Sequence, residues 1–225
     1  EEYLYSQGID PKIPPTPLFE DKFLEKLHKK SSKAKTQELQ HAIVEHIEEH
    51  WEEDPELYER FSDRLKRLLE EYRENWDVLY DELEKLRGEM KKGREVEQTF
   101  GLEPKKEMPF FGLIKSEIFG KKSVSELTDS EIDFLVNTTK DIIEIISREA
   151  QTVDFWENIS KQKRLKSYII SHLLKKISSS TLKNNDTVSE ETVPYMVNSI
   201  TDIVFGKRNE IAQKLIELAY YHFRK

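Results

Sequence analysis

The chain has 225 residues, a formal net charge of −8 and no cysteine. These values exclude disulfides, thiolate metal sites and cysteine nucleophiles, and they exclude the chain as a whole as an electrostatic binder of nucleic acid. Charged residues make up 36% and only 7 residues are glycine, which favours helices. No apolar run approaches the roughly 20 residues of a transmembrane helix, no signal-peptide pattern opens the chain, and the lack of cysteine allows a reducing cytoplasm.

Residues 1–35 are expected to form an irregular, proline-rich lead-in. Four prolines between positions 11 and 17 oppose a helix over residues 1–20. A short helix is predicted over residues 20–30, with Phe23, Leu24 and Leu27 facing inward. The string KKSSKAK then indicates a solvated joint.

An amphipathic helix is predicted over residues 36–53, where Leu39, Ile43, Ile47 and Trp51 recur every four positions. The string HIEEH at positions 46–50 lies within it and matches H-x-x-E-H, the inverted zinc-peptidase pattern.

In that pattern two histidines hold a metal, here His46 and His50, and a glutamate, here Glu49, acts on the bound water. The helix ends about four residues later, and no third ligand is marked out among the many glutamates. We therefore interpret the string as a helix surface, and zinc hydrolysis remains an alternative that elemental analysis would test.

One long helix is predicted over about residues 55–92. Asp54 suits its N-cap and Pro55 its first helical position. From Tyr58 to Met90 the apolar residues follow heptad-like steps of three and four, with one extra step of four. At 1.5 Å per residue this helix would be roughly 54 Å long and would form a spine.

Further helices are expected after residue 100. Pro104 begins one that runs to Phe119, with Gly120 as its C-cap. Thr128 and Glu131 fit a capping box that opens a strongly apolar helix.

The last third of the chain is expected to hold a helix over about residues 157–177, with Asp154 as its N-cap. The polar residues 178–192 indicate a mobile loop. A helical pair follows over about residues 194–205 and 207–223, with Gly206 between its members. With no strand expected, the prediction is an all-α fold of about seven helices, made of a helical domain over residues 36–177 and a C-terminal pair over residues 193–225.

Two glycine–lysine strings resemble the end of a phosphate-binding loop without its context. FGKKS (119–123) has Lys115 where the first glycine should stand, and a helix rather than a strand precedes it. VFGKRN (204–209) has the same shape.

The acidic set of Asp10, Glu20 and Asp21 before Lys22 loosely fits metal-dependent nucleases, but the intervening prolines oppose the strands that such sites need. We therefore predict no catalytic, cofactor-binding or metal-binding residue.

Charge is distributed unevenly along the chain. Residues 161–185 carry seven basic residues and no acidic one, whereas residues 38–103 carry 21 acidic and 10 basic residues. This uneven charge distribution can steer binding partners, or it can let the basic end of the chain contact phosphates. The alternative is that lysines and glutamates simply keep different helices soluble. The candidate contacts with nucleic acid or a partner are Lys161, Lys163, Arg164, Lys166, Lys175 and Lys176. The candidate structural anchors are Asp54, Pro55, Tyr58, Asp154, Phe155 and Trp156.

Several strings, in order, resemble one family. They are FEDKFLEKL, HAIVEHIEEHWEEDPELYERFSDRLKRLLEEYRENWDVLYDELEKL, GLEPKKEMPFFGLIKSEIFG and VDFWENISKQKRLKSYIISHLL. From about Gly8 to Leu174 the chain resembles the C-terminal helical region of the restriction (R) subunit of type I restriction–modification enzymes. The most specific parts are the Asp54–Tyr58 turn, the Gly101–Leu102 turn and Asp154–Trp156, which are structural rather than catalytic signatures.

The resemblance implies a parent protein that is an ATP-driven DNA translocase and nuclease of a bacterial or archaeal cytoplasm. ATP and Mg²⁺ would serve motor and nuclease regions that precede this one, and no cofactor is expected here. The implied partners are the modification (M) and specificity (S) subunits, the parent's motor domains, and DNA through the parent. The helical region would dock the subunit onto the M and S core, and the alternative is a nucleic-acid contact through the basic residues 161–185.

Overall fold

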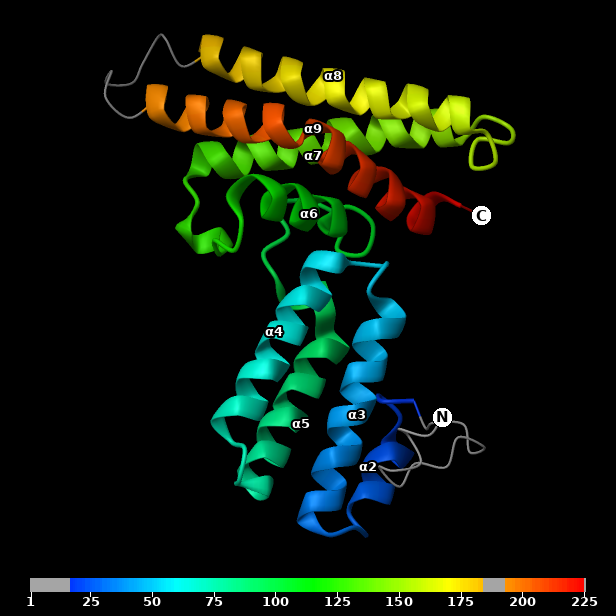
Figure 1. Cartoon of the computed structure of the whole chain (residues 1–225), viewed down its shortest axis with the longest axis vertical. Coiled ribbons are helices and arrows are strands. Elements are labelled where there is room, and N and C mark those ends of the chain that lie inside the picture. The colour runs from blue at the N-terminus through cyan, green and yellow to red at the C-terminus, as the bar shows by residue number, and fades with distance from the viewer. Residues whose placement is uncertain (1–16, 184–192, 225) are drawn as a thin grey trace. The chain divides into compact units, whose positions relative to one another are not determined.

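The computed structural model describes residues 17–183 and 193–224. Within these ranges the chain forms eight α-helices and no strand, which confirms the all-α prediction (Figure 1). They are α2 (Asp21–Leu27), α3 (Ser32–His50), α4 (Pro55–Glu71), α5 (Trp76–Lys92), α6 (Met108–Phe119), α7 (Asp129–Ala150), α8 (Ile159–Lys183) and α9 (Val193–Phe223). Two short 3-10 helices, η1 (Gly93–Val96) and η2 (Val124–Glu126), complete the elements. Over the same ranges, no helix combines the length and the apolar character that crossing a bilayer requires.

The helices divide into two compact units that interleave along the chain. Unit 1 comprises the described residues up to His50 together with Tyr58–Gly93. Unit 2 comprises Trp51–Leu57 and the described residues from Arg94 onward. The segment 51–57, which includes the first turn of α4, therefore belongs to a different unit from the helices on either side of it.

Unit 1 is built around the pairing of α3 with α5. The predicted stripe of α3 is buried at Leu39, Ile43 and Ile47, whereas Trp51 lies beyond the helix and is 40% exposed. Helix α5 contributes Leu79, Tyr80, Leu83, Leu86 and Met90. The Thr36 hydroxyl donates to the Trp76 carbonyl at 3.0 Å and so joins the two helices near their ends.

The single long helix predicted over residues 55–92 is wrong, because the chain breaks it into α4 and α5 at residues 72–75. The break lies at the extra four-residue step of the apolar stripe, between Tyr72 and Trp76. Asn75 begins α5 by accepting a hydrogen bond from the Val78 N–H. The two helices then form a hairpin, in which Arg64 of α4 pairs with Glu89 of α5. The apolar stripe that predicted one long helix is therefore buried in two shorter helices, α4 and α5.

Unit 2 packs α7, α8 and α9 alongside one another, with α6 against α7 and α9 (Figure 1). Helix α6 is apolar on nearly all sides, and Phe110, Phe111 and Ile114 are almost completely buried. A helix without a polar face needs neighbours around it, and α7 and α9 supply them. The predicted capping box at the start of α7 is present, with Thr128 and Glu131 bonded reciprocally.

Three predictions for the C-terminal third need correction. Helix α8 continues to Lys183 instead of ending near residue 177, so the predicted loop keeps only residues 184–192, which lie outside the described residues. The predicted helical pair is one helix, α9, which runs through Gly206 and changes direction along its length (Figure 1). Buried residues Val204 and Ile211 are seven apart, so the apolar register continues across the glycine. Tyr168, predicted to face inward, is 42% exposed.

Candidate functional site

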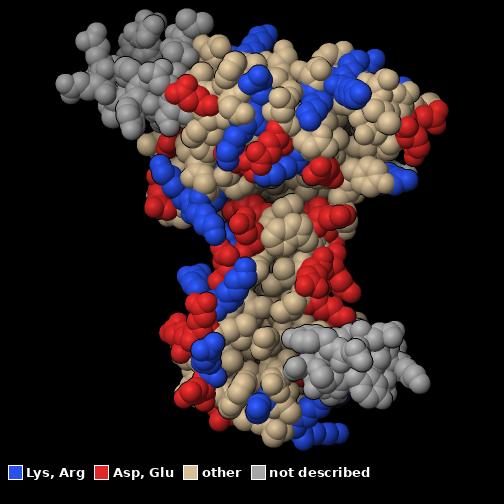
Figure 2. All heavy atoms as spheres, viewed as in Figure 1, with Lys and Arg blue, Asp and Glu red and all other residues tan. Residues whose placement is uncertain are grey.

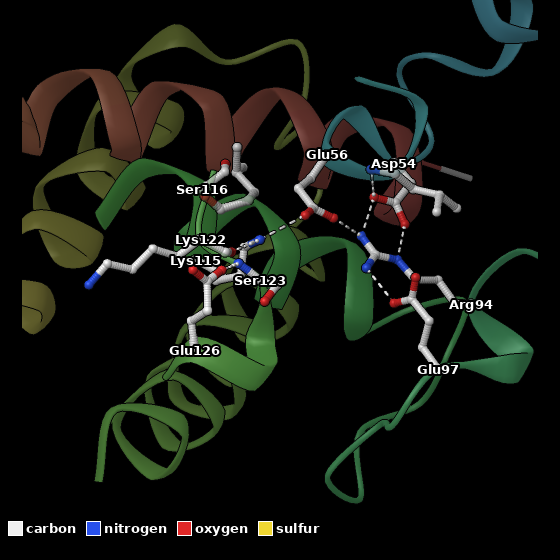
Figure 3. Close-up of polar contacts among 11 residues, drawn as sticks. Asp54, Glu56, Arg94, Glu97, Lys115, Ser116, Lys122, Ser123 and Glu126 are labelled. Atoms are coloured by element: carbon white, nitrogen blue, oxygen red, sulfur yellow. Dashed lines mark hydrogen bonds and ion pairs between the residues drawn. The ribbon is translucent and has the colours of Figure 1, made fainter. Parts of the chain in front are cut away.

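A buried ionic network lies in unit 2, at the first turn of α4 (Figure 3). Asp54 caps that turn by accepting a hydrogen bond from the Leu57 N–H at 3.1 Å. Both Asp54 carboxylate oxygens also accept from Arg94, from Nε and Nη2 at 2.8 Å each. This bidentate pairing joins the start of α4 to η1, 40 residues later.

The Arg94 guanidinium has two more carboxylate partners. Its Nη2 donates to Glu56 at 2.7 Å, and its Nη1 donates to Glu97 at 2.8 Å. Burial alone would lower the pKa of Arg94, but hydrogen bonding and charge from Asp54, followed by Glu56 and Glu97, raise it above its ordinary value. Sequence reasoning marked Asp54 but missed Arg94 and Glu56, because no local pattern links residues about 40 apart.

Lys115 of α6 completes the network. Its Nζ donates to Glu56 Oε1 and to the Lys122 carbonyl, at 3.0 Å each (Figure 3). Gly112, one turn earlier, allows the close approach, because a Cβ there would lie 2.5 Å from Arg94 Nη2. The network therefore contains two buried cations and two buried carboxylates, with Glu97 at its edge.

These contacts decide the reading of the FGKKS string. Gly120 has a φ of 63° and ends α6 by donating its N–H to the Ser116 carbonyl at 3.0 Å. Lys115, the residue at the first-glycine position of a phosphate loop, is buried against Glu56. The segment is a helix end and has none of the strand-to-helix context of a phosphate loop. Of the nuclease-like acidic set, Asp10 lies outside the described residues.

His46 and His50, from the H-x-x-E-H string, are packed in an aromatic cluster. Their rings lie 4.0 Å apart, and Tyr58 and Phe19 contact the His46 ring. Burial, followed by the charge of His50, lowers the pKa of His46 to about 4. In the described ranges no three His, Asp or Glu side chains are grouped so as to hold a metal.

The basic residues of α8 divide into two groups. Arg164 pairs with Glu149 at 2.9 Å and Lys176 with Asp141 at 2.6 Å, both on α7. Lys166 donates to Gln213 of α9 at 3.1 Å, and Lys161 to the Val153 carbonyl. Lys163 and Lys175 are exposed, and no ion-pair partner for either lies among the described residues. Four of the six candidate contacts thus hold α8 in place.

The turn between α7 and α8 differs from the prediction. Asp154 is exposed with a φ of 55°, and it does not cap α8. Asn158 caps it instead, because its Oδ1 accepts from the N–H groups of Ser160 and Lys161 at 3.0 and 3.2 Å. A cap must immediately precede its helix, and α8 begins only at Ile159.

The same turn presents apolar side chains at one end of unit 2. Phe155 is buried and meets the Trp156 ring edge to face, with centroids 4.8 Å apart. Trp156 in turn meets Tyr220 of α9 at 5.4 Å. We call the exposed side chains around this stack the end patch. They are Val153, Ile159 and Tyr220, with exposed fractions of 76%, 67% and 40%.

Comparison with known proteins gives one match. A family model described as "Type I restriction enzyme HindI endonuclease subunit-like, C-terminal" matches residues 9–192. No curated protein and no solved structure matches the chain. The matched range includes the buried ionic network, the turn of the end patch and all of α8, and it ends where α9 begins.

Proposed function

Since the chain belongs to the family of C-terminal regions of type I restriction enzyme HindI endonuclease subunit-like proteins, we propose that it is a non-catalytic helical module that docks the endonuclease subunit onto its modification (M) and specificity (S) subunits. The parent would be an ATP-dependent DNA translocase and endonuclease. Its ATP and Mg²⁺ would bind in regions that precede this one, and the parent's motor domains would be further partners.

The observation that carries the proposal is the end patch. Val153 and Ile159 are large apolar side chains that are mostly exposed, although the adjacent Phe155 is fully buried. Apolar groups gathered around a fixed aromatic stack are typical of protein interfaces, whose centres are rich in tyrosine and tryptophan. The stack is held rigidly, because Gln162 donates to the Trp156 carbonyl at 2.7 Å and Arg224 lies over the Tyr220 ring.

The buried charges support a structural role in place of a catalytic one. Arg94 is bonded to three carboxylates, and Lys115 to the Glu56 carboxylate and the Lys122 carbonyl, in contacts that connect α4, η1 and α6. A catalytic group needs access to substrate, whereas these side chains are at most 7% exposed. The network is suited to hold a docking surface in shape.

The test is co-elution of the intact endonuclease subunit with its M and S subunits on a sizing column, at low and at moderate salt. Val153→Ser with Ile159→Ser should remove the joint peak, and folding should be unaffected because both side chains are exposed. Val96→Ser is the matched control, since Val96 is also 67% exposed in unit 2 but lies away from the end patch in sequence. A joint peak that survives the double substitution at both salts would contradict docking through this patch.

A further inference from the structure

The outward side of α8 is rich in cations and hydroxyls. At 100° per residue, eight of its exposed positions fall on one face of the helix. We call them the α8 stripe: Ser160, Lys163, Arg164, Ser167, Tyr168, Ser171, Lys175 and Ser178. No acidic residue occurs between Asn158 and Lys183. Figure 2 shows Lys and Arg side chains along the upper edge of the molecule, where α8 runs.

Within this stripe, the side chains of two lysines form no hydrogen bond or ion pair with the described residues. Lys163 and Lys175 have no partner among the described residues, whereas four neighbouring cations are bonded to α7, α9 or the preceding turn. Twelve residues separate them, or about 18 Å along the helix axis. Arg164 lies beside Lys163, and half of its side chain surface is exposed although it pairs with Glu149.

We propose that the α8 stripe binds the sugar–phosphate backbone of duplex DNA without reading its sequence. Phosphate oxygens in protein–DNA complexes are contacted chiefly by Arg and Lys, and by the hydroxyls of Ser, Thr and Tyr, which are the residue types of this stripe. The stripe contains no Asn or Gln that could pair with an adenine edge, and its one guanidinium, that of Arg164, is paired with Glu149.

Duplex DNA is a better fit than an acidic protein. A carboxylate-rich partner would be served by cations alone, whereas the α8 stripe also carries the exposed hydroxyls of Ser160, Tyr168 and Ser171; those of Ser167 and Ser178 donate to carbonyls within the helix. The matched family model is described as that of a type I restriction enzyme endonuclease subunit, and we take DNA as the ligand that an endonuclease subunit would contact. The inference rests on that membership and not on the docking role, because its residues exclude those of the end patch.

The experiment measures binding of a fluorescent 30-base-pair duplex of arbitrary sequence to the full chain, over a salt series. Each phosphate neutralised contributes about 0.9 to the slope of log K against log salt. Replacing Lys163 and Lys175 by Gln should therefore lower the slope by about 1.8. If parent and variant converge near 1 M salt, the affinity falls about 60-fold at 0.1 M. Lys66→Gln with Arg67→Gln, on the exposed face of α4, is the control of equal charge change and should leave the slope unchanged.

Two results would overturn the proposal. The first is an unchanged slope in the K163Q/K175Q variant, with circular dichroism showing that the variant is as helical as the parent. The second is competition by poly-glutamate as effective as that by unlabelled duplex, which would assign the stripe to an acidic protein. Failure of co-elution with the M and S subunits would affect only the docking proposal, since the duplex experiment uses no partner protein.

Discussion

At the scale of single residues, Arg94 is a buried cation that pairs with several carboxylates. A buried guanidinium is tolerated only with carboxylate partners in good geometry, and Arg94 has three, from Asp54, Glu56 and Glu97. The sequence allows Asp54 to be predicted as a helix cap, because the Asp-Pro pair is a local signal. It gives no sign of Arg94, because a contact across 40 residues depends on how the helices pack.

A prediction at this scale concerns His46 and pH. The pKa of His46 in the fold is about 4, below its ordinary value of 6.5, so the unfolded chain takes up this proton first as the pH falls. Stability should therefore be present above pH 6.5 and be lost between pH 6.5 and about 4. Replacing His46 by Gln should reduce that loss, as measured by urea unfolding at pH 7, 5.5 and 4.5.

The matched control for this prediction is His41→Gln, which removes a histidine from the same helix without touching the ring cluster of Phe19, His46, His50 and Tyr58. The urea midpoints, and not absolute stability at one pH, are the quantity to compare, because losing the ring contacts lowers stability at every pH. Equal losses in the parent and the His46→Gln variant would refute the assignment.

At the scale of elements, the sequence predicts where helices occur better than where they stop. The capping box of α7 and the glycine end of α6 are local devices, and both were predictable. The turn between α4 and α5 was not, because Tyr72–Asn75 contains neither Gly nor Pro and the apolar pattern runs through it. The break lets α5 pack against α3 while Arg64 of α4 pairs with Glu89 of α5, and such contacts between distant residues belong to the packed unit.

Two helical glycines provide an element-scale prediction with opposite signs. A Cβ at Gly112 of α6 would lie 2.5 Å from Arg94 Nη2 and 3.0 Å from Glu56 Oε2, whereas one at Gly206 of α9 would meet no atom within 4 Å. Gly112→Ala should destabilise unit 2 by about 1–3 kcal/mol through overpacking. Gly206→Ala should stabilise it by about 0.5–1 kcal/mol, as alanine does inside an open helix.

Chemical denaturation of the two variants, followed by circular dichroism, measures both effects. The opposite signs make the pair self-controlling, since both changes add the same methyl group to a helix of the same unit. A Gly112→Ala variant as stable as the parent would show that the Arg94–Glu56 contact is not held as described.

At the scale of the whole molecule, α9 shows that the fold extends beyond the family match. The match ends at residue 192, yet α9 buries Val204, Ile211, Leu215 and Leu218 against the other helices of unit 2. Its last turn is fixed as well, because the Tyr221 hydroxyl donates to Glu53 at 2.7 Å. That hydrogen bond raises the pKa of Tyr221 to about 12.

We therefore predict that a chain ending at residue 192 will not fold its second unit. It should bind a hydrophobic dye strongly and lose cooperative unfolding, because the apolar faces of α6 and α8 would be open to water. A chain ending at residue 223 is the control and should behave as the parent. If the shorter chain unfolds cooperatively and is as stable as the parent, then α9 is not required for unit 2 to fold.

The interleaving of the two units also limits how such a protein can evolve. Recombination between related genes works best when a crossover leaves interacting residues on the same inherited piece. Here Asp54 and Glu56 lie before residue 58, where the second segment of unit 1 begins, and their partners Arg94 and Lys115 lie after that segment, so a single crossover between residues 56 and 94 separates the buried charges from their counterions. The part of the hairpin that belongs to unit 1 can vary in sequence or length in place, and it can be exchanged between lineages by two crossovers that both lie between residues 56 and 94, because all four buried charges then come from one lineage.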